Sequence, residues 1–216
     1  QILISPKNKN FKLIENKMIV GKSNPKSDVF DVLEFACRDI KEAKIPSDIK
    51  YISSYCFENC KKLEIIEFPQ NSQLIKIGKN GFANSSISHI SIPKHCKYIY
   101  ENCFKFASQL KNIEFHINSE IEWISDKSFA SSNISSITIP SKVFLTRSDA
   151  FCECFNLNSV SVLGDFVCLQ NDTFNKCNNL SFIEFPNASK IQIYSKTFVN
   201  SNIMIFINHG SQISFH

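Results

Sequence analysis

A single phenylalanine recurs along almost the whole chain at nearly constant intervals, and this repeat constrains the fold more than any other feature. An apolar residue usually stands five positions before it, and only Thr146 breaks that pattern. A repeat of this length cannot enclose its own apolar side chains, but stacked copies can share one continuous core, so we expect an elongated solenoid of about eight coils. The recurring residues, 22 to 25 positions apart, are Phe35, Phe57, Phe82, Phe104, Phe129, Phe151, Phe174 and Phe198, preceded by Phe30, Ile52, Ile77, Ile99, Ile124, Leu169 and Ile193.

A second pattern follows each of these phenylalanines and predicts a strand. It reads aliphatic-x-x-apolar-x-apolar and is often closed by proline, as in Leu63, Ile66, Phe68 and Pro69. The alternation has a period of two, which places its outer two residues inward and the middle one outward. Proline has no N–H to donate, so it ends the strand. Equivalent strands of successive coils are therefore expected to pair in parallel on one face of the solenoid.

The fold class expected from these two patterns is a mostly β solenoid. It has coils of 22 to 25 residues, a parallel sheet on one face, and short turns or 3₁₀ pieces on the other, because no segment shows a sustained 3.6-residue apolar period. Residues 1–34 lie outside the repeat and are predicted to form an N-terminal cap or a spacer between arrays. Residues 35–216 are assigned to the repeat array.

The combined motif resembles a known repeat family. It reads [Ile/Leu]-x-x-x-x-Phe-x-x-[Cys/Ser]-x-x-Leu-x-x-Ile-x-[Ile/Phe]-Pro and is clearest over 52–69 and 169–186. This is similar to the BspA-like class of leucine-rich repeats, with proline where better-known leucine-rich repeats close the strand with asparagine. The resemblance implies a leucine-rich-repeat solenoid that acts as a binding or adhesion module of a surface antigen, at the cell surface or secreted.

Charge and hydropathy argue against two kinds of partner. The formal net charge is only +4, from 24 Lys and Arg against 20 Asp and Glu. So small an excess does not favour nucleic-acid binding. No apolar run approaches the roughly 20 residues of a membrane-spanning helix, so we expect no membrane span.

The nine cysteines are interpreted as parts of the core. A free thiol is small and easily buried, and five cysteines keep fixed positions around the recurring Phe; a disulfide is the alternative. Their spacing lacks the paired C-x-x-C of a zinc site, so we expect neither metal nor cofactor. The histidines fall on predicted turns or outward positions, no catalytic constellation stands out, and we expect no enzyme. The five repeat-linked cysteines are Cys56, Cys60, Cys103, Cys154 and Cys177.

The outward side of the predicted parallel strands is the candidate binding face. Its flat, mostly polar surface with a few apolar residues suits an extended protein or glycan ligand. The alternative is a solvated sheet face in a structural spacer that displays another part of a longer chain. The middle positions are Glu67, Ser91, Glu114, Thr138, Ser161 and Glu184, with Ile207 in the last copy, and the neighbouring outward positions include Ile65, His89, Asn112 and Phe182, with Ile205 in the last copy.

The C-terminal coil is predicted to be a weak point of the array. Its strand segment 203–207 is apolar throughout, without a closing proline or a charge, and the alignment places Asn208 where an earlier copy has Ile139. An uncovered last coil exposes apolar side chains and unpaired strand groups. We therefore expect that this end either continues into further repeats in a longer chain or pairs with a second copy, so that the 216-residue chain self-associates weakly through residues 198–213.

Overall fold

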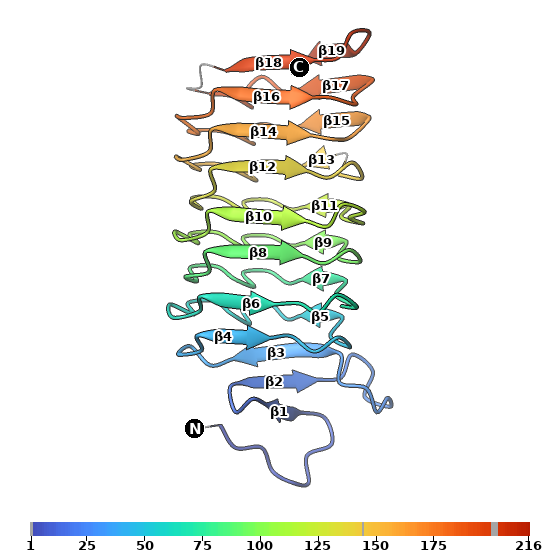
Figure 1. Cartoon of the computed structure of the whole chain (residues 1–216), viewed down its shortest axis with the longest axis vertical. Helices are drawn as coiled ribbons and strands as arrows, with labels where there is room; N and C mark the ends of the chain where they lie inside the picture. Colours follow the sequence, from blue (N-terminus) through green and yellow to red (C-terminus); the bar gives the residue numbers. More distant parts are fainter. Residues whose placement is uncertain (1, 144, 200–202) are drawn as a thin grey trace.

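Each copy of the repeat forms one turn of an elongated solenoid in the computed structural model (Figure 1), which describes residues 2–143, 145–199 and 203–216. Within those residues every regular element is a strand and none is a helix. The expected fold class is thus confirmed. Every coil contributes one strand to each of two ladders, which we call the first ladder and the second ladder.

The first ladder is the predicted series of parallel strands. Each strand ends either at the last inward residue of the apolar triplet or one residue before it. Proline directly follows strands β8, β12 and β16. Inward residues such as Ile90 and Ile137 are buried, as the alternation predicts. The strands are β4 (Glu42–Lys44), β6 (Ile65–Glu67), β8 (His89–Ile92), β10 (Asn112–Phe115), β12 (Ser136–Ile139), β14 (Ser159–Val162), β16 (Phe182–Phe185) and β18 (Met204–Ile207).

The first ladder is hydrogen-bonded in three blocks: β4–β6, β8–β10 and β12–β18. The breaks follow β6 and β10, whose connections to the second ladder are long, residues 68–75 and 116–122. The corresponding connections after β8 and β12 are the shorter 93–97 and 140–144. The two breaks in the ladder thus coincide with its two long connections. The two 25-residue intervals of the repeat, 57–82 and 104–129, contain these long connections.

The second ladder was not expected. Residues five positions before the recurring Phe face inward from short parallel strands, where the sequence suggested turns or 3₁₀ pieces. Most of these strands have two residues, too few to show a period of two in the sequence. The strands are β3 (Val32–Ala36), β5 (Tyr51–Ile52), β7 (Lys76–Ile77), β9 (Tyr98–Ile99), β11 (Trp123–Ile124), β13 (Leu145–Thr146), β15 (Phe166–Leu169), β17 (Lys190–Ile193) and β19 (Gln212–Phe215).

The recurring phenylalanines form a column of stacked rings through the core. Six rings are fully buried, from Phe57 to Phe174, and Phe198 continues the column half-buried. Neighbouring ring centroids lie 4.9 to 5.7 Å apart with interplanar angles of 3 to 11°. This spacing is close to the roughly 4.8 Å between paired strands. One ring per coil therefore fills the core without strain between coils.

The backbone around each stacked ring makes a further set of bonds between coils. Around Phe57, the amides of Tyr55, Phe57 and Asn59 donate to carbonyls of the next coil at 2.8 to 2.9 Å. The residues two before and two after the ring have positive φ, 64° at Tyr55 and 58° at Asn59, and the same holds in the next five coils. Left-handed residues at both sides of the ring turn these amides toward the neighbouring coil, which fixes the length of the turn.

Two antiparallel strands precede the array, β1 (Lys12–Ile14) and β2 (Met18–Gly21). Strand β2 pairs antiparallel with β3, and its side chains Met18 and Val20 are buried against the first coil. Because β3 is extended through residue 36 by this pairing, Leu33 aligns with Ile52. The assignments of Phe30 to the inward column and of Phe35 to the ring column are therefore wrong.

Arg38 lies five residues after Leu33, where later coils have the stacked Phe. Its guanidinium donates to the carbonyls of Cys56 at 2.8 Å and Tyr55 at 3.1 Å. The half-buried Phe35 ring packs on this guanidinium at 4.9 Å. The Arg38 guanidinium thus closes the N-terminal end of the core by donating hydrogen bonds to carbonyls of the next coil.

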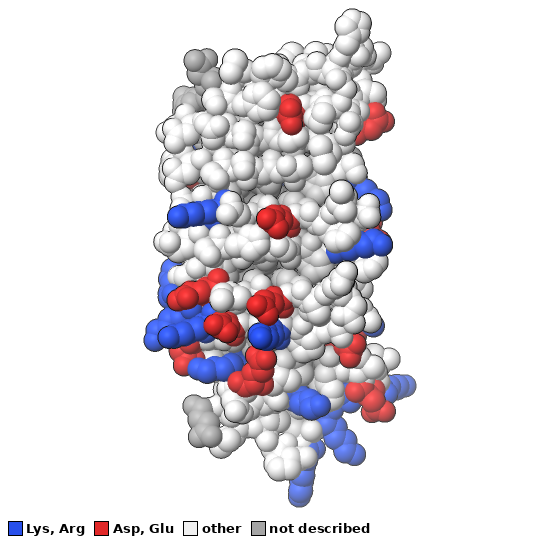
Figure 2. Space-filling view, in the orientation of Figure 1, with Lys and Arg blue, Asp and Glu red and all other residues white. Residues whose placement is uncertain are grey.

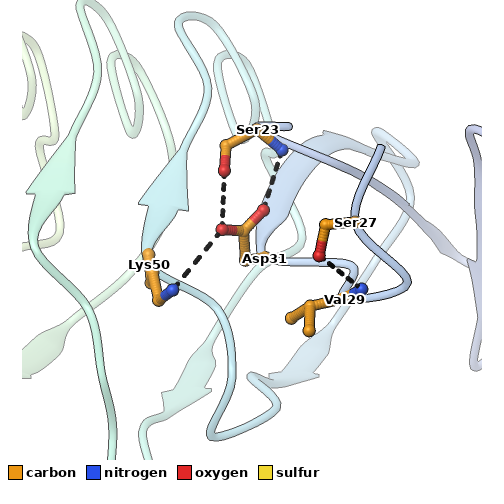
Figure 3. Close-up of polar contacts among 5 residues, drawn as sticks. All are labelled: Ser23, Ser27, Val29, Asp31 and Lys50. Atoms are coloured by element: carbon orange, nitrogen blue, oxygen red, sulfur yellow. Dashed lines mark hydrogen bonds and ion pairs between the residues drawn. The ribbon is translucent and has the colours of Figure 1, made fainter. Parts of the chain in front are cut away.

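Asp31 ties the N-terminal segment to the first coil (Figure 3). Its buried carboxylate accepts hydrogen bonds from the Ser23 amide at 2.8 Å and the Ser23 hydroxyl at 2.7 Å, and lies 3.7 Å from the Lys50 ammonium. Burial alone raises the pKa of this carboxyl, but the Ser23 hydrogen bonds and the Lys50 charge outweigh it, so the pKa is lower than usual. The ionised form therefore stabilises the folded N-terminal segment.

The register of the last coil differs from the sequence alignment by one residue. Strand β18 pairs Met204 with Phe182 and Phe206 with Glu184. Outward positions are therefore held by Met204 and Phe206, and the assignment of Ile205 and Ile207 to them is wrong. The observed register turns two apolar isoleucines inward and keeps Asn208 out of the core, and a one-residue slip would exchange the two sides of the strand.

Candidate functional site

Apart from Ile205 and Ile207 of the last coil, the residues predicted to form the binding face lie on the outward side of the first ladder. The strand registers align Glu114 with Ser91, Thr138 with Ser161, and Ser161 with Glu184. The two outward columns are therefore continuous within each hydrogen-bonded block. The exposed members are Glu67, Ile65, His89, Ser91, Asn112, Glu114 and Thr138, and the half-buried members are Ser161, Phe182 and Glu184.

Charged side chains gather over the N-terminal half of this face, whereas the C-terminal half is almost free of them (Figure 2). In the N-terminal half, Lys44 lies 3.9 Å from Glu67, and Glu114 accepts a hydrogen bond from Ser91 at 3.2 Å. These groups are exposed, and such surface pairs contribute little to stability, about 0–1 kcal/mol. In this half Lys44 and Glu67 are thus oppositely charged neighbours, and Glu114 has Ser91 and His89 beside it.

The C-terminal half of the face combines small hydroxyls with an apolar end. From β12 to β18, Glu184 is the one charged outward residue in the two columns. Serine and threonine hold the outward positions of β12 and β14, and Phe182 then packs on Phe206 with ring centroids 4.8 Å apart. Met204 and Phe206 are 60% and 52% exposed. We call Phe182, Met204 and Phe206 the apolar end of the face.

A groove of about 440 Å³ opens on the face at the break between β10 and β12. Glu114 and Thr138 of the predicted face line it, together with Ile117, Pro140 and Leu163. The Ile117 side chain is 94% exposed. The groove can receive an apolar side chain of a ligand between two polar groups. The lining residues outside the columns were missed, although the 25-residue interval between Phe104 and Phe129 marks the irregularity.

The cysteines predicted to be core residues are buried as expected. Cys56, Cys60, Cys103, Cys154 and Cys177 are at most 1% exposed, and all nine cysteines are free thiols. Burial raises the pKa of the Cys103 thiol well above its usual value and that of Cys96 to about 12. Among the residues described by the structure, no three or more His, Cys, Asp or Glu side chains are grouped so that they could hold a metal ion.

Comparisons with known proteins agree with the repeat. A model of the BspA type leucine rich repeat region, in six copies, matches residues 33–158 and 113–215. The pneumococcal vaccine antigen PcpA has a similar structure, with a TM-score of 0.63 and 18% identity over 94% of this chain and 71% of that chain. The leucine-rich repeat protein TpLRR of T. pallidum gives a TM-score of 0.59 and 15% identity over 98% of this chain and 85% of that one. At these identities the two structures show a shared fold alone.

No curated protein matches the sequence. In the part of the chain that the structure describes, no helix is long and apolar enough to span a bilayer. Proteins with this type of repeat generally serve as protein-interaction or surface-antigen modules. The matched residues cover nearly the whole array, and the structure shows the stacked coils that such a repeat requires. The chain belongs to the BspA-type leucine-rich repeat family.

Proposed function

We propose that this array is a non-enzymatic binding module of a surface antigen, displayed at the cell surface or secreted, and that it contacts a protein ligand through the outward side of the first ladder. The C-terminal half of that face carries the proposal. The cores of protein–protein interfaces are poor in charge and rich in aromatic residues and methionine, with a polar rim around them. The uncharged hydroxyl positions of β12 and β14, followed by Phe182, Met204 and Phe206, have this composition.

In this proposal the C-terminal half of the face binds the partner, and the N-terminal half orients it. The hydroxyl surface allows close approach of a partner backbone, and the apolar end and the groove beside Ile117 offer burial for apolar side chains. In the N-terminal half Lys44 and Glu67 already form an ion pair within the chain. Charges of this kind steer association and tune specificity more than they add affinity. Residues 1–34 act in this scheme as the N-terminal cap, held through Asp31.

The test is a binding assay of the full chain against a panel of purified extracellular-matrix and mucosal proteins. A variant with Thr138→Lys and Ser161→Lys places two charges on neighbouring outward positions of the first ladder. The matched control, Gln192→Lys with Ser214→Lys, makes the same change on neighbouring positions of the second ladder. We expect the first variant to weaken binding at least about tenfold, the effect of burying unpaired charge at an interface, and the control to bind as the unchanged chain does.

The second candidate function is a structural spacer that displays another part of a longer chain. The continuous column of stacked rings, six of them fully buried, favours it because such a core makes the array a stiff rod. A spacer has no ligand of its own. Binding that is equal for the unchanged chain and both double variants, or absent across the panel, would support the spacer and contradict the binding module.

We also propose that the chain associates weakly with a second copy through its last coil. β18 and β19 each pair with a single strand of the described chain and are the outermost strands of their ladders. Exposed strand edges with apolar side chains favour pairing with another chain. Sedimentation across a concentration series should show self-association that Phe206→Lys removes. Phe155→Lys, at a side chain with a similar exposure of 50%, is the matched control, and a strict monomer at high concentration would contradict the proposal.

A further inference from the structure

The second ladder carries a pocket of about 420 Å³, on a different sheet from the proposed protein-binding face. Its walls come from β9, β11 and the turns that follow β9, β11 and β13. The register pairs Trp123 with Tyr98, and Tyr100 lies beside Tyr98 with ring centroids 6.3 Å apart at an angle of 57°. Trp123 is 38% and Tyr100 42% exposed. Three aromatic side chains from two adjacent coils thus surround one hollow.

The polar groups of this pocket are mostly free to bind a ligand. The Arg147 guanidinium lies 4.4 Å from the Trp123 ring centroid and makes no ion pair within the described chain. The exposed Asp126 carboxylate and the Tyr100 and Ser125 hydroxyls also have no hydrogen-bond partner among the described side chains. Planar donors and acceptors therefore stand at the edge of an aromatic surface.

One lining carboxylate differs from this pattern because it is already held in place. Glu101 accepts hydrogen bonds from the Lys79 ammonium at 3.0 Å and from the Asn102 amide at 3.1 Å. With Glu101 paired to Lys79, the lining retains one charge of each sign, Asp126 and Arg147, and the Lys76 ammonium lies outside the lining, 6.0 Å from the Tyr100 ring centroid. The pocket consequently has no net charge that would select an anion or a cation.

We propose that this pocket binds a neutral pyranose sugar, the terminal or penultimate residue of a glycan. A pyranose has an apolar face of C–H groups and a rim of hydroxyls that both donate and accept. Aromatic rings offer a large, rigid apolar surface for such a face, and a few well-placed polar groups fix the orientation of a ligand in a pocket. Trp123 and Tyr100 supply the surface beside the Arg147 guanidinium, and Arg147 and Asp126 supply a donor and an acceptor for hydroxyls of the sugar.

Other classes of ligand fit these groups less well. A phosphorylated or acidic ligand would lie beside the Asp126 carboxylate, which has no ion pair among the described residues, and a quaternary ammonium ligand would be repelled by the Arg147 guanidinium that lies on the Trp123 ring. An extended peptide that adds a strand needs an open sheet edge, but β11 is paired on both sides, with β9 and β13. The volume of about 420 Å³ lies at the small-ligand end of the roughly 300–1,000 Å³ found for such pockets.

The experiment uses the fact that Trp123 is the single tryptophan of the chain. A titration of the full chain with neutral methyl glycosides of glucose, galactose, mannose and N-acetylglucosamine is followed by tryptophan fluorescence, which reports on this pocket alone. A glycan array with neutral, sialylated and sulfated glycans identifies the preferred terminal sugar. We expect a saturable change in fluorescence with at least one neutral glycoside and array signals from glycans that end in that sugar.

The variants locate the site. Tyr100→Ala and Asp126→Ala should each weaken sugar binding at least about tenfold, the loss of a stacking contact or of a hydrogen-bonded acceptor. Both side chains are exposed, so the thermal unfolding midpoint should not change. The matched control is Tyr51→Ala, since Tyr51 lies in the same outward column through Lys76 but outside the pocket.

Three results would overturn the proposal: no response to any neutral glycoside, binding that both pocket variants retain, or binding restricted to sialylated and sulfated glycans. The double variant Thr138→Lys with Ser161→Lys, on the first ladder, should bind sugar as the unchanged chain does. Loss of protein binding and loss of sugar binding are therefore separable. The failure of either proposal leaves the other standing.

Discussion

Truncation of a central ring should damage the array far more than truncation of its last ring. Phe129 is fully buried, with ring neighbours on both sides at 5.1 Å and 5.2 Å. Phe198 is half-buried and has one ring neighbour, Phe174, at 5.7 Å. Removal of a core Phe to Ala costs about 3–5 kcal/mol through lost burial and the cavity left behind. With one neighbour and partial exposure, Phe198→Ala should cost about half of that, roughly 1.5–2.5 kcal/mol.

Urea unfolding followed by circular dichroism gives the free energy of unfolding, and Trp123 fluorescence reports on the coil that contains Phe129. Because each coil contacts only its neighbours, the stability of a solenoid is nearly a sum of coil and interface terms. Phe129→Ala should therefore weaken the interfaces with both neighbouring coils. The urea midpoints reported by circular dichroism and by Trp123 fluorescence should both shift. Equal losses at Phe129 and Phe198, or a loss below about 1 kcal/mol at Phe129, would refute the stacked core.

Three further predictions concern the cap, the thiols and the end of the array. Asp31→Ala leaves the Ser23 amide without its partner and should cost about 1–3 kcal/mol by urea unfolding at pH 7. Since the folded pKa of Asp31 lies below its unfolded value of about 3.9, its contribution is present above that pH and is lost as the pH falls through the folded pKa. An acid titration of stability should therefore flatten in Asp31→Asn, and an unchanged titration would contradict this role. Cys56, Cys60 and Cys103, whose pKa values burial raises, should resist thiol reagents until urea unfolds the chain, so rapid labelling of the native protein would contradict their burial. Phe206→Lys should abolish concentration-dependent sedimentation while Phe155→Lys preserves it, and equal behaviour of the two would rule out β18 as the contact.

The architecture was predictable because it depends on residues that recur. A single Phe per coil with an apolar-x-apolar triplet is enough to infer stacking, parallel pairing and the inward side of each strand, as at Ile90 and Ile92. The second ladder was not predictable in the same way. Strands of two residues, such as β9, carry one inward side chain each, and a single apolar position has no period.

The ends of the array show where pattern reading fails. At the N-terminus Phe35 has the spacing of a further copy of the repeat, but antiparallel pairing with β2 sets the register of β3 and makes Leu33 the inward residue. At the C-terminus the observed register pairs Met204 with Phe182 and Phe206 with Glu184, one residue away from the register that the distance from Phe198 predicts. In both places a tertiary contact decides between two registers that the local sequence allows.

The candidate face was predictable in its membership but not in its organisation. Alternation alone identified the outward columns, including Thr138 and Ser161. The groove at the β10–β12 break and the aromatic pocket on the second ladder each combine residues from different coils with irregular turns. Such sites depend on which turns are long and on how the aromatic side chains are oriented. The repeat pattern predicts neither.

Positional photo-crosslinking tests the proposed binding face most directly. The photoreactive amino acid benzoylphenylalanine replaces Ser161, at the centre of the uncharged half of the first ladder, or Gln192, on the second ladder. Each protein is irradiated with a ligand found in the purified panel, and the products are identified by mass spectrometry. The account predicts a crosslink from position 161 and none from position 192. A crosslink from 192 alone, or equal yields from both positions, would contradict it.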